Sequence, residues 1–512
     1  MPHKKSLSIC ICFKCGYSSS KDRPRINVPL MQSFLYTGSS PSGDDFQQAR
    51  HVRENLVEYL TRLDAEKKSM EEALAVYERV LAPVRRLPPE ILMEIFAWTR
   101  NSQSYHAHRV KGSPWVVSHV CKTWRAAALS CPELWTNFIV SHRSVHRKDP
   151  CSMLRAIVKR CQNVLHFVFR SIAKRTTSEE DRKFKALFQI LLTHSKNWTV
   201  ADLSLISDLI PMLSQIRGRL PNLCCLYFSS SYPDVGVIDG FEISPRLTDL
   251  TIDWQFNQKT QIIFPASKLI NFIDRRIPDP RYPPHPSSIN IIRSAPDLQT
   301  FHNTDALPSR ITPRIRHEHL TTINICDSCL LGSLSLPALT DVTLARPPTG
   351  FPPQSDRLQA LHDLVSHSHC SLLSLRLLET PLNRHLSGIL ERSPKLTSLS
   401  LEFFQWRRTD DVCLRSIIAH DGLMPHLKTL IFLRHFIRVG DMDEMAAKFV
   451  DAVFVDAVAL RWKSSFLKTV QIDVDLPVSL SSADVARLKG LKEEGLGISL
   501  CAKSYDGSKI IV

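Results

Sequence analysis

Glycine, long apolar runs and the motifs of common catalytic sites are scarce or missing in this chain. Only 16 of its 512 residues are glycine, which leaves little material for Gly-rich loops that cradle phosphate groups. The sequence has no G-x-x-x-x-G-K-[ST], no G-x-G-x-x-G after an expected strand and no G-x-S-x-G. These absences argue against nucleotide hydrolysis, dinucleotide binding and serine-nucleophile chemistry. We therefore expect neither enzyme activity nor a cofactor.

No stretch is apolar enough for a membrane helix, which needs about 18 consecutive residues of low polarity. Asp451 and Asp456 interrupt the apolar run around Phe449 to Leu460. The run from Leu7 to Phe13 is too short for a secretory signal, and no small-residue cleavage pattern follows it. The sequence predicts a soluble intracellular protein of the cytoplasm, the nucleus or both, with no membrane partner.

Metal-binding patterns are incomplete. The 14 cysteines are scattered rather than spaced as a disulfide framework, so we expect them to stay reduced. Cys10 to Cys15 form C-x-C-x-x-C and Cys326 to Cys329 form C-x-x-C, but neither has the second pair that a structural zinc site needs. His317-Glu318-His319 lacks the i, i+4 histidine spacing of zinc proteases. We predict no metal site.

Positive charge is in excess and unevenly distributed. The net charge is +15, and Arg85 to Lys185 hold 19 Lys plus Arg against 7 Asp plus Glu, or 19 − 7 = +12. Such a segment could neutralise the phosphates of a nucleic acid, complement an acidic protein, or form a solvated face without a partner. With 43% hydrophobic residues the chain can also bury a large core, in more than one folding unit.

The N-terminal part divides into two stretches. Residues 1 to 45 are rich in Ser, Pro, Gly and Lys without periodicity, which predicts disorder. Residues 46 to 82 carry apolar side chains three, four or seven positions apart with charges between them, which predicts a short coiled-coil-like helix. This helix could pair with a second chain or fold back on the rest of the protein. Its apolar stripe consists of Val52, Leu56, Tyr59, Leu63, Met70, Tyr77 and Leu81.

Two further segments have the pattern of short amphipathic helices. Leu87-Pro88-Pro89-Glu90 predicts a helix start, because proline is tolerated in the first turn and Glu suits the positive helix end. The apolar residues up to Phe96 make a stripe too wide for so short a helix to bury. Val116 to Trp124 predict a second helix with apolar residues on one face. The apolar surface left over is typical of a protein interface.

Three ordered motifs in this region carry a family resemblance. They are Leu-Pro-Pro-Glu-Ile-Leu with a following Ile-Phe at Leu87 to Phe96, Val-Cys-x-x-Trp-Arg at Val120 to Arg125, and Pro-x-Leu-Trp at Pro132 to Trp135. Residues 83 to 140 resemble the F-box, a small all-α module, and Ala126 to Pro132 look like the F-box families of mushroom-forming fungi. The loop from Arg100 to Pro114 is longer and more polar than in the compact module.

The resemblance implies docking to a Skp-type adaptor, and through it to the cullin and RING subunits of a ubiquitin ligase. Skp-type adaptors are acidic, which favours a protein partner for the basic segment over a nucleic acid. Cys121 could be a thioester nucleophile, but within this motif we interpret it as a small core side chain. The implied adaptor-binding residues are Leu87, Pro88, Pro89, Glu90, Ile91, Leu92, Ile95, Phe96, Val117, Val120, Cys121 and Trp124.

Residues 150 to 505 contain an irregular internal repeat, L-x-x-L-x-L, that starts anew about every 20 to 40 residues. Because side chains alternate along a strand, the first, fourth and sixth positions should face a shared core. The pattern resembles irregular leucine-rich repeats, which implies a solenoid with a parallel sheet and hence an α/β fold. An ordinary α/β domain with similar strand starts is the alternative. Units begin at Leu223, Leu247, Leu298, Leu320, Leu339, Leu372, Leu396, Leu427 and Leu467, with probable members at Val164, Trp198 and Leu269.

The segments between the repeat units alternate between helical and extended patterns. Most units lack the asparagine that ladders the turns of regular leucine-rich repeats, so we expect uneven curvature. Helices are predicted for Asp356 to Ser366, Arg384 to Glu391, Asp410 to Ala419 and Glu444 to Arg461. Extended loops are predicted for Pro278 to Pro286 and Pro347 to Pro353.

The third, fifth and seventh positions of each unit should face outward, where a repeat protein usually binds its partner. This row is mixed polar with few basic residues, which suits a protein target better than a phosphate track. Aromatic residues just past strand ends could anchor such a partner or cap the core. The candidate target-binding residues are Tyr227, Asp249, Thr251, Asp253, Trp254, His302, Arg376, Glu402 and Trp406.

The combination predicts a substrate receptor of a Skp-cullin-F-box (SCF) ubiquitin ligase, with the F-box on the adaptor and the repeats on a target protein. A repeat scaffold that assembles proteins without ubiquitin transfer is the second hypothesis. A nucleic-acid binder is the third, and the +12 segment is its only support. The sequence does not identify the target.

Overall fold

The computed structural model describes residues 28–99, 104–109, 113–171, 178–231, 236–255, 260–276, 287–303, 312–346, 356–403, 407–420, 422–434, 447–464, 466–503 and 509–512. The chain divides into two compact units, Met1–Leu92 and Met93–Val512. Helix α3 (Pro89–Trp98) crosses this division.

The first unit is helical. Helix α1 spans Val28–Thr37 and α2 spans Gly43–Leu81, and a 3₁₀ turn, η1, follows at Pro83–Arg86. Ser42 caps α2 by accepting a hydrogen bond from the backbone N–H of Asp45 at 3.2 Å. Helix α2 therefore occupies the predicted 46 to 82 helix. Helix α1 lies within the stretch 1 to 45 for which the sequence predicts disorder, and residues 1 to 27 lie outside the described part of the chain.

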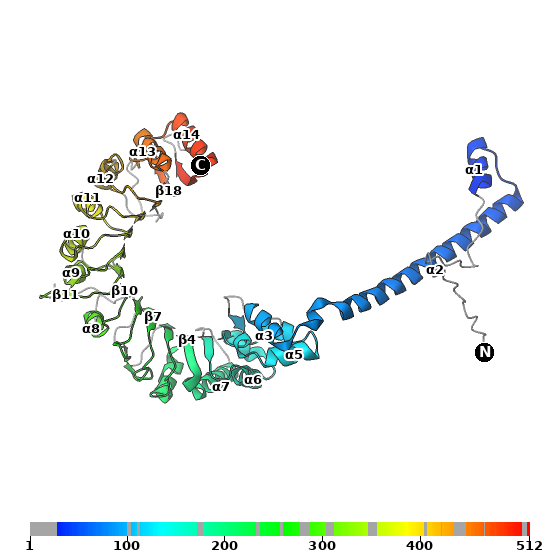
Figure 1. Ribbon diagram of the computed structural model, residues 1–512, viewed down its shortest axis with the longest axis horizontal. Coiled ribbons are helices and arrows are strands. Elements are labelled where there is room, and N and C mark those ends of the chain that lie inside the picture. The colour runs from blue at the N-terminus through cyan, green and yellow to red at the C-terminus, as the bar shows by residue number, and fades with distance from the viewer. Residues whose placement is uncertain are drawn as a thin grey trace. The chain divides into compact units, whose positions relative to one another are not determined.

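The second unit is built on a large sheet whose 16 strands follow each other in chain order (Figure 1). All neighbouring pairs are parallel except β19 with β20. The strands are β1 (Tyr105–His106), β2 (Phe138–Ser141), β3 (Leu165–Arg170), β4 (Trp198–Leu205), β5 (Cys225–Ser231), β7 (Asp249–Gln255), β9 (Asn271–Asp274), β10 (Thr300–Asn303), β12 (Thr322–Ile325), β14 (Asp341–Leu344), β15 (Ser374–Leu378), β16 (Ser398–Phe403), β17 (Thr429–Arg434), β18 (Thr469–Pro477), β19 (Gly497–Lys503) and β20 (Lys509–Ile511). Two separate two-stranded sheets pair β6 (Val237–Ile238) with β8 (Gln261–Ile262) and β11 (Ile315–Arg316) with β13 (Leu334–Ser335).

The side chains at the first, fourth and sixth positions of the repeat units form the core beneath this sheet. In β15 and the residue pair before it, Leu372, Leu375 and Leu377 are each 0% exposed. Leu375 pairs with Leu399 of β16, so equivalent core positions stack in register. The α/β class and the large, mostly parallel sheet are thus confirmed.

Two units depart from the predicted burial, each at one position. Val164 is 42% exposed, and Leu165 is buried in its place, beside an irregularity in the pairing of β3 with β4. Leu430 is half-buried although it holds a fourth position. Strands β2 and β19 also join the sheet without having been counted as repeat units.

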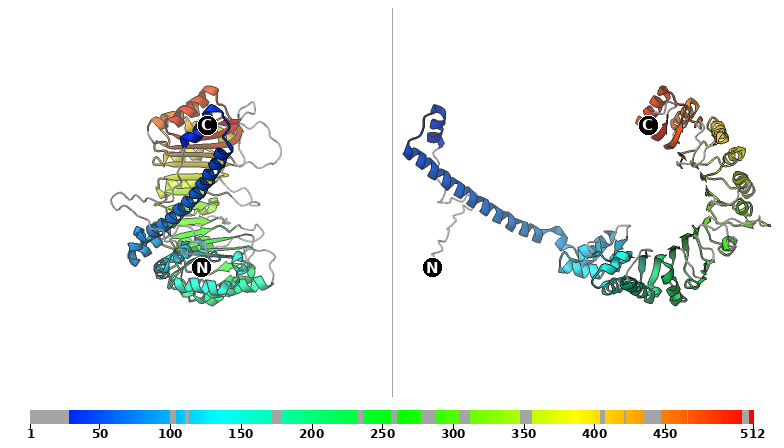
Figure 2. Two further views of the ribbon diagram at one scale, coloured as in Figure 1. Left: turned by 90° about the vertical axis from the view of Figure 1, so that its right-hand side faces the viewer. Right: turned by 180° about the vertical axis from the view of Figure 1, so that it is seen from behind.

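Helices connect many of the strands and cover one face of the sheet, while the other face carries none of the labelled helices (Figures 1 and 2). The predicted helix Arg384 to Glu391 coincides with α11, and α10 and α12 lie within two residues of their predicted starts. Of the predicted helix Glu444 to Arg461, residues 444–446 lie outside the described residues and residues 447–451 are not helical. The observed one begins at Ala452, because the Asp451 carboxylate caps it by accepting from the Phe454 N–H at 3.1 Å.

These connecting helices are α6 (Pro150–Arg160), α7 (Ser178–Thr193), α8 (Ser287–Ser294), α9 (Ser328–Gly332), α10 (Arg357–Ser368), α11 (Arg384–Glu391), α12 (Arg408–Ile418), α13 (Ala452–Lys463) and α14 (Ser482–Glu493), with 3₁₀ segments η3 (His142–His146), η4 (Ser195–Asn197) and η5 (Ser207–Ile216). The predicted loops Pro278 to Pro286 and Pro347 to Pro353 lie outside the described residues.

The region from 83 to 140 contains two strands besides the helices that the resemblance implies. Tyr105 and His106 form β1 inside the predicted long loop, and Phe138 to Ser141 form β2. The two pair in parallel at the edge of the large sheet. Sheet pairing therefore begins before the predicted boundary, because the edge of a sheet offers free backbone groups to any nearby extended segment.

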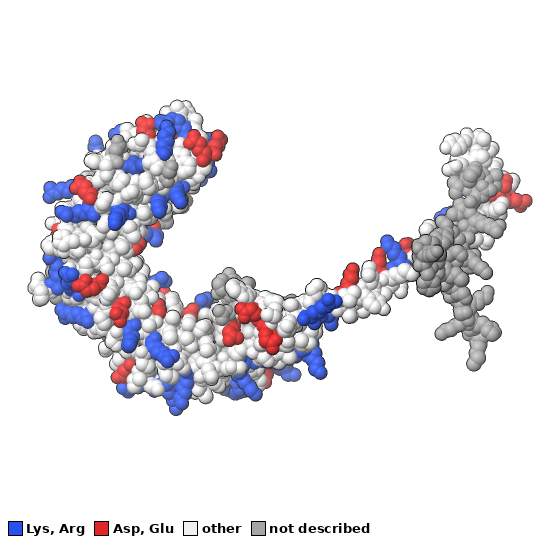
Figure 3. Space-filling model, viewed as in Figure 1, with Lys and Arg blue, Asp and Glu red and all other residues white. Residues whose placement is uncertain are grey.

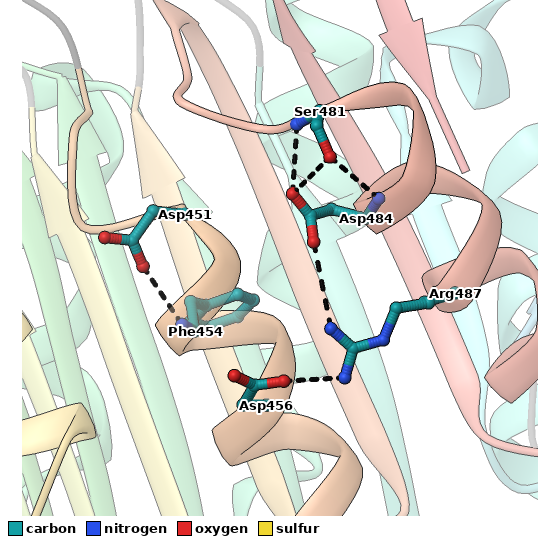
Figure 4. A network of polar contacts seen from close by, with 6 residues as sticks. All are labelled: Asp451, Phe454, Asp456, Ser481, Asp484 and Arg487. Atoms are coloured by element: carbon teal, nitrogen blue, oxygen red, sulfur yellow. Dashed lines mark hydrogen bonds and ion pairs between the residues drawn. The ribbon is translucent and has the colours of Figure 1, made fainter.

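Polar contacts tie the last helices together (Figure 4). The Ser481 side chain accepts from the Asp484 N–H at 3.2 Å, and Asp484 accepts from the Ser481 N–H at 3.0 Å, which makes a reciprocal cap at the start of α14. Arg487 of α14 reaches Asp456 of α13 at 2.6 Å. The hydrogen bonds from the Ser481 hydroxyl and N–H lower the pKa of Asp484.

The cap of α14 generates a pH-dependent prediction. A carboxyl group with a lowered pKa in the folded state stabilises the protein above its ordinary pKa, and this contribution disappears as the pH falls through the lowered value. Ser481→Ala should therefore lower the free energy of unfolding by about 1 kcal/mol at pH 7 and by less near pH 3. Urea unfolding at both pH values measures this. Ser482→Ala, on the exposed neighbour, is the control and should change stability little at either pH.

Candidate functional site

Helix α3 separates its apolar residues onto two sides. Leu92 and Phe96 are each 1% exposed, whereas Ile91 and Ile95 are 48% and 41% exposed. Leu92 and Phe96 therefore belong to the core, which corrects the expectation that they face a partner. The reason is the i, i+4 spacing, which places these two residues above one another on one side of the helix.

The predicted second helix is broken in two. Helix α4 spans Ser113–Ser118 and α5 spans Lys122–Leu129, so Val116 to Trp124 do not form one continuous helix. Cys121 adopts an extended conformation and caps α5, since its Sγ accepts from the Trp124 N–H at 3.5 Å. Val120 consequently lies in the turn between the helices, where it is 57% exposed.

Aromatic side chains hold these helices in place. The rings of Phe96 and Trp124 have centroids 5.0 Å apart, which packs α3 against α5. Trp135 is fully buried, and its indole N–H donates to the Ala128 carbonyl at 2.7 Å. The guanidinium of Arg160 lies 4.2 Å from the Trp135 ring centroid, a cation–π contact with α6. The motif Pro132 to Trp135 thus fixes α5 to the part of the unit that carries the sheet.

Apolar side chains remain exposed on this anchored region. Ile95 is 41% exposed, Val116 53%, Val120 57% and Trp98 81%. The sequence reasoning did not include Trp98, although its positions i+3 from Ile95 and i+7 from Ile91 place it on the same stripe. Of the other predicted adaptor-binding residues, Pro88, Pro89 and Glu90 are exposed, and Leu87, Val117, Cys121 and Trp124 are half-buried.

The face of the sheet that lacks helices carries a row of polar side chains, as the alternation predicts. The Tyr227 hydroxyl donates to Asp253 of the next strand at 2.9 Å. The Asn271 amide donates to Asp249 at 2.6 Å. Both contacts join neighbouring strands: Asn271 and Asp249 are register partners, whereas Tyr227 reaches diagonally past its own partner, Thr251, to Asp253. The row is therefore organised across the sheet.

A cross-strand ion pair continues this row on β15 and β16. Arg376 is exposed and its Nε donates to the Glu402 carboxylate at 2.8 Å. Thr251 also faces outward and is half-buried. The Trp254 side chain and the whole of Trp406 lie outside the described residues.

His302 is the titratable group of this face with the most altered environment. Burial and, to a smaller extent, the positive charge of Arg275 lower the pKa of His302 to about 4, against the opposing effects of a hydrogen bond with Asn324 and the charge of Asp274. The imidazole is therefore neutral at pH 7. It offers a target one hydrogen-bond donor and one acceptor rather than a charge.

Groups that could hold a metal ion were sought among the described residues. His142, His146 and Glu180 bring their ligand atoms within 4.8 Å of one another. No such set is found around Cys326 and Cys329 or around His317 in the described part of the chain. The predicted C-x-C-x-x-C lies outside that part.

Burial raises the pKa of several thiols, to about 12 for Cys161 and to about 11 for Cys225, Cys370 and Cys413. A raised pKa lowers the thiolate fraction at neutral pH, which makes these thiols poor nucleophiles and poor metal ligands. Cys161 and Cys370, which are buried, behave as small core side chains.

Comparisons of this sequence with protein-family models and with curated proteins return no match. Among the helices that the structure describes, none is both long and apolar enough to cross a membrane.

The environment of His302 predicts how stability depends on pH. Unfolded histidine has a pKa of about 6.5, so the unfolded chain binds a proton at a higher pH than the native chain does. The contribution of His302 to the free energy of unfolding is therefore fully present above about pH 6.5. It is lost as the pH falls from about 6.5 toward 4. His302→Gln should remove this component, which urea unfolding at pH 7 and pH 5 measures. The exposed His420→Gln serves as control; an unchanged pH dependence in His302→Gln would contradict the assignment.

Proposed function

We propose that this chain is the substrate receptor of an SCF-type ubiquitin ligase. In this proposal residues 83 to 140 act as an F-box that docks a Skp-type adaptor, and the sheet-bearing region from 150 to 505 binds a target protein. The observation that carries the proposal is the set of exposed apolar residues on α3, on α4 and in the turn before α5, the helix that Trp135 anchors: Ile95, Trp98, Val116 and Val120. Exposed apolar side chains on a rigid support are the usual core of a protein interface.

The order of the motifs supports the same proposal. The three F-box-like motifs follow each other from Leu87 to Trp135, and each has a defined place in the helical region. Pro89 opens α3, Cys121 caps α5, and Trp135 is the buried anchor. A chance set of similar motifs would have no reason to share one helical assembly.

The repeat pattern supports a leucine-rich-repeat-like solenoid as the finer description of the second unit. Strands that follow in chain order, with the same three positions buried, are what stacked repeats require. The sheet face with Tyr227, Asp253, Arg376 and Glu402 is then the proposed target surface. Its paired charges suit recognition of a polar protein surface.

Catalysis in such a complex belongs to other subunits. The adaptor would connect the chain to a cullin and a RING subunit, and a ubiquitin-charged partner would modify lysines of the target. The receptor itself contributes proximity, which raises the effective concentration of target and ubiquitin without reactive groups. The alternative is a scaffold without ubiquitin transfer. A ligase receptor would bring cullin into the complex together with the adaptor, whereas a scaffold would bind the adaptor without cullin.

The distribution of charge favours a protein partner over a nucleic acid. On the face drawn in Figure 3, Lys and Arg alternate with Asp and Glu along the sheet-bearing unit rather than forming one band. Duplex binding needs many phosphate contacts along a continuous basic track. We therefore assign the +12 segment to attraction of an acidic protein.

The adaptor surface is tested with two matched valines. Val120 is 57% exposed on the proposed surface and Val412 is 64% exposed on α12. Val120→Asp should weaken binding to a purified Skp-type adaptor by about 2 kcal/mol, roughly thirtyfold in Kd, because it buries an unpaired charge in the interface. Val412→Asp should leave the Kd unchanged. Titration calorimetry with the full chain measures both, and equal affinity in the two variants would refute the docking site.

Helix α2 supports a coiled-coil pairing between two copies of the chain. None of its 39 residues is buried, and its apolar stripe keeps the seven-residue spacing of Leu56, Leu63, Met70 and Tyr77. An isolated stripe of this length gains most by pairing with an identical one in register.

The pairing generates a prediction on oligomeric state. Leu63→Asp places a charge in the apolar stripe along which the two α2 helices would pair. In sedimentation the wild-type chain should be a dimer and this variant a monomer. Val57→Asp, which changes a 53% exposed residue off the stripe, should leave the dimer intact. A monomeric wild-type chain, or equal effects of both substitutions, would exclude the pairing.

A further inference from the structure

A cluster of two histidines and one glutamate lies apart from the proposed adaptor and target surfaces. His142 and His146 belong to η3, directly after β2, and Glu180 is in the first turn of α7. The His146 Nδ1 lies 3.4 Å from Glu180 Oε1, and the His142 Nε2 lies 4.0 Å from Glu180 Oε2. Each carboxylate oxygen therefore faces a different imidazole.

The fold positions these three side chains through buried neighbours. Ser144 and Val145 are buried between the two histidines, and the Ser144 hydroxyl accepts from the Ser141 N–H at 3.2 Å, which holds η3 in place. On α7, Phe184 lies one turn after Glu180 and packs on Phe169 of the sheet with ring centroids 4.6 Å apart. The three ligand atoms thus come from two separately anchored segments.

The chemistry of this set fits a divalent transition metal. Imidazole nitrogen and carboxylate oxygen bind zinc at about 2.0–2.2 Å, which puts tetrahedral ligand atoms about 3.4 Å apart. The His146 to Glu180 distance of 3.4 Å already matches, and the ligand atoms of the whole set lie within 4.8 Å of one another. The His142 Nε2 and Glu180 Oε2 atoms are 4.0 Å apart, which is too far for a direct hydrogen bond. An ion between them would contact both atoms.

The two segments differ in charge: η3 also carries Arg143, whereas the first turn of α7 is acidic. The first turn of α7 carries Glu179, Glu180 and Asp181, which offset the positive end of the helix. Lys183, close to the cluster in sequence, is paired with Glu179 at 2.7 Å. His146 is the most exposed member of the set, with 58% of its side chain accessible, so an ion can enter from solvent.

We propose that His142, His146 and Glu180 bind one zinc ion. Two imidazoles and one carboxylate make three protein ligands and leave a fourth position for water. The ion connects the segment after β2 to the helix after β3 and so clamps the first strands of the large sheet, next to the helices held by Trp135. This proposal stands independently of the adaptor and the target.

Cobalt and zinc binding to the full chain test the site. After treatment with a chelator and a reductant, Co²⁺ should bind with one equivalent and give visible ligand-field bands without the near-ultraviolet thiolate band, and Zn²⁺ should displace it. His146→Gln and Glu180→Gln should each weaken binding at least about tenfold, because loss of even an outer-shell partner costs a metal site about 10–100-fold. Zinc should also raise the thermal unfolding midpoint of the wild type and not of these variants.

His362 and His385 offer a matched control. Their rings are 5.7 Å apart with Asp363 beside His362, yet they do not form a converging set among the described residues. His385→Gln should bind metal like the wild type. The proposal fails if His146→Gln and Glu180→Gln keep wild-type affinity, or if bound cobalt carries the thiolate band and is therefore held by cysteines. Circular dichroism of the isosteric Glu180→Gln distinguishes a lost site from a lost fold.

Discussion

Burial of three apolar side chains per repeat unit is the interaction on which the rest of this structure depends. Each such side chain contributes about 1.5–3 kcal/mol by leaving water, but a single strand has nothing to bury it against. Only when Leu375 of one strand stacks on Leu399 of the next does the core become continuous. The same alternation that buries these positions turns their neighbours to the other face, so the polar row with Tyr227 and Arg376 is a consequence of the core.

The helical region depends on this sheet in turn. Short helices such as α4 and α5 cannot bury enough surface to be stable alone. Trp135 provides the missing contact, because it is enclosed by Trp115, Arg160 and the carbonyl of Ala128. Because these contacts bury the inner side of the helices, the helices stay folded although Val116 and Val120 remain exposed on the surface. Exposed apolar groups on a rigid support are suited to a partner, which is the physical basis of the proposed docking function.

Much of this organisation could be predicted from the sequence, and the failures have a common cause. Periodicity located the buried repeat positions and the bounds of α11, because both follow from local spacing. Periodicity failed where a single polar group outweighed it. Asp451 delays the start of α13 by capping its first turn, and Cys121 ends the apparent helix through Val120 in the same way. The pairing of β1 with β2 was missed because its two partners are far apart in sequence and carry no shared pattern.

The sequence by itself determined the α/β class, the phase of burial along each repeat and the polar character of the opposite face, since all three follow from the alternation of side chains along a strand. Only the tertiary structure decided which apolar residues of the helical region stay exposed, because Leu92 and Ile95 differ in surroundings and not in chemistry. It also decided that His142, His146 and Glu180 meet. Their approach depends on the position of β3 between the two segments, and no spacing of residues along the chain encodes a contact that only the sheet brings about.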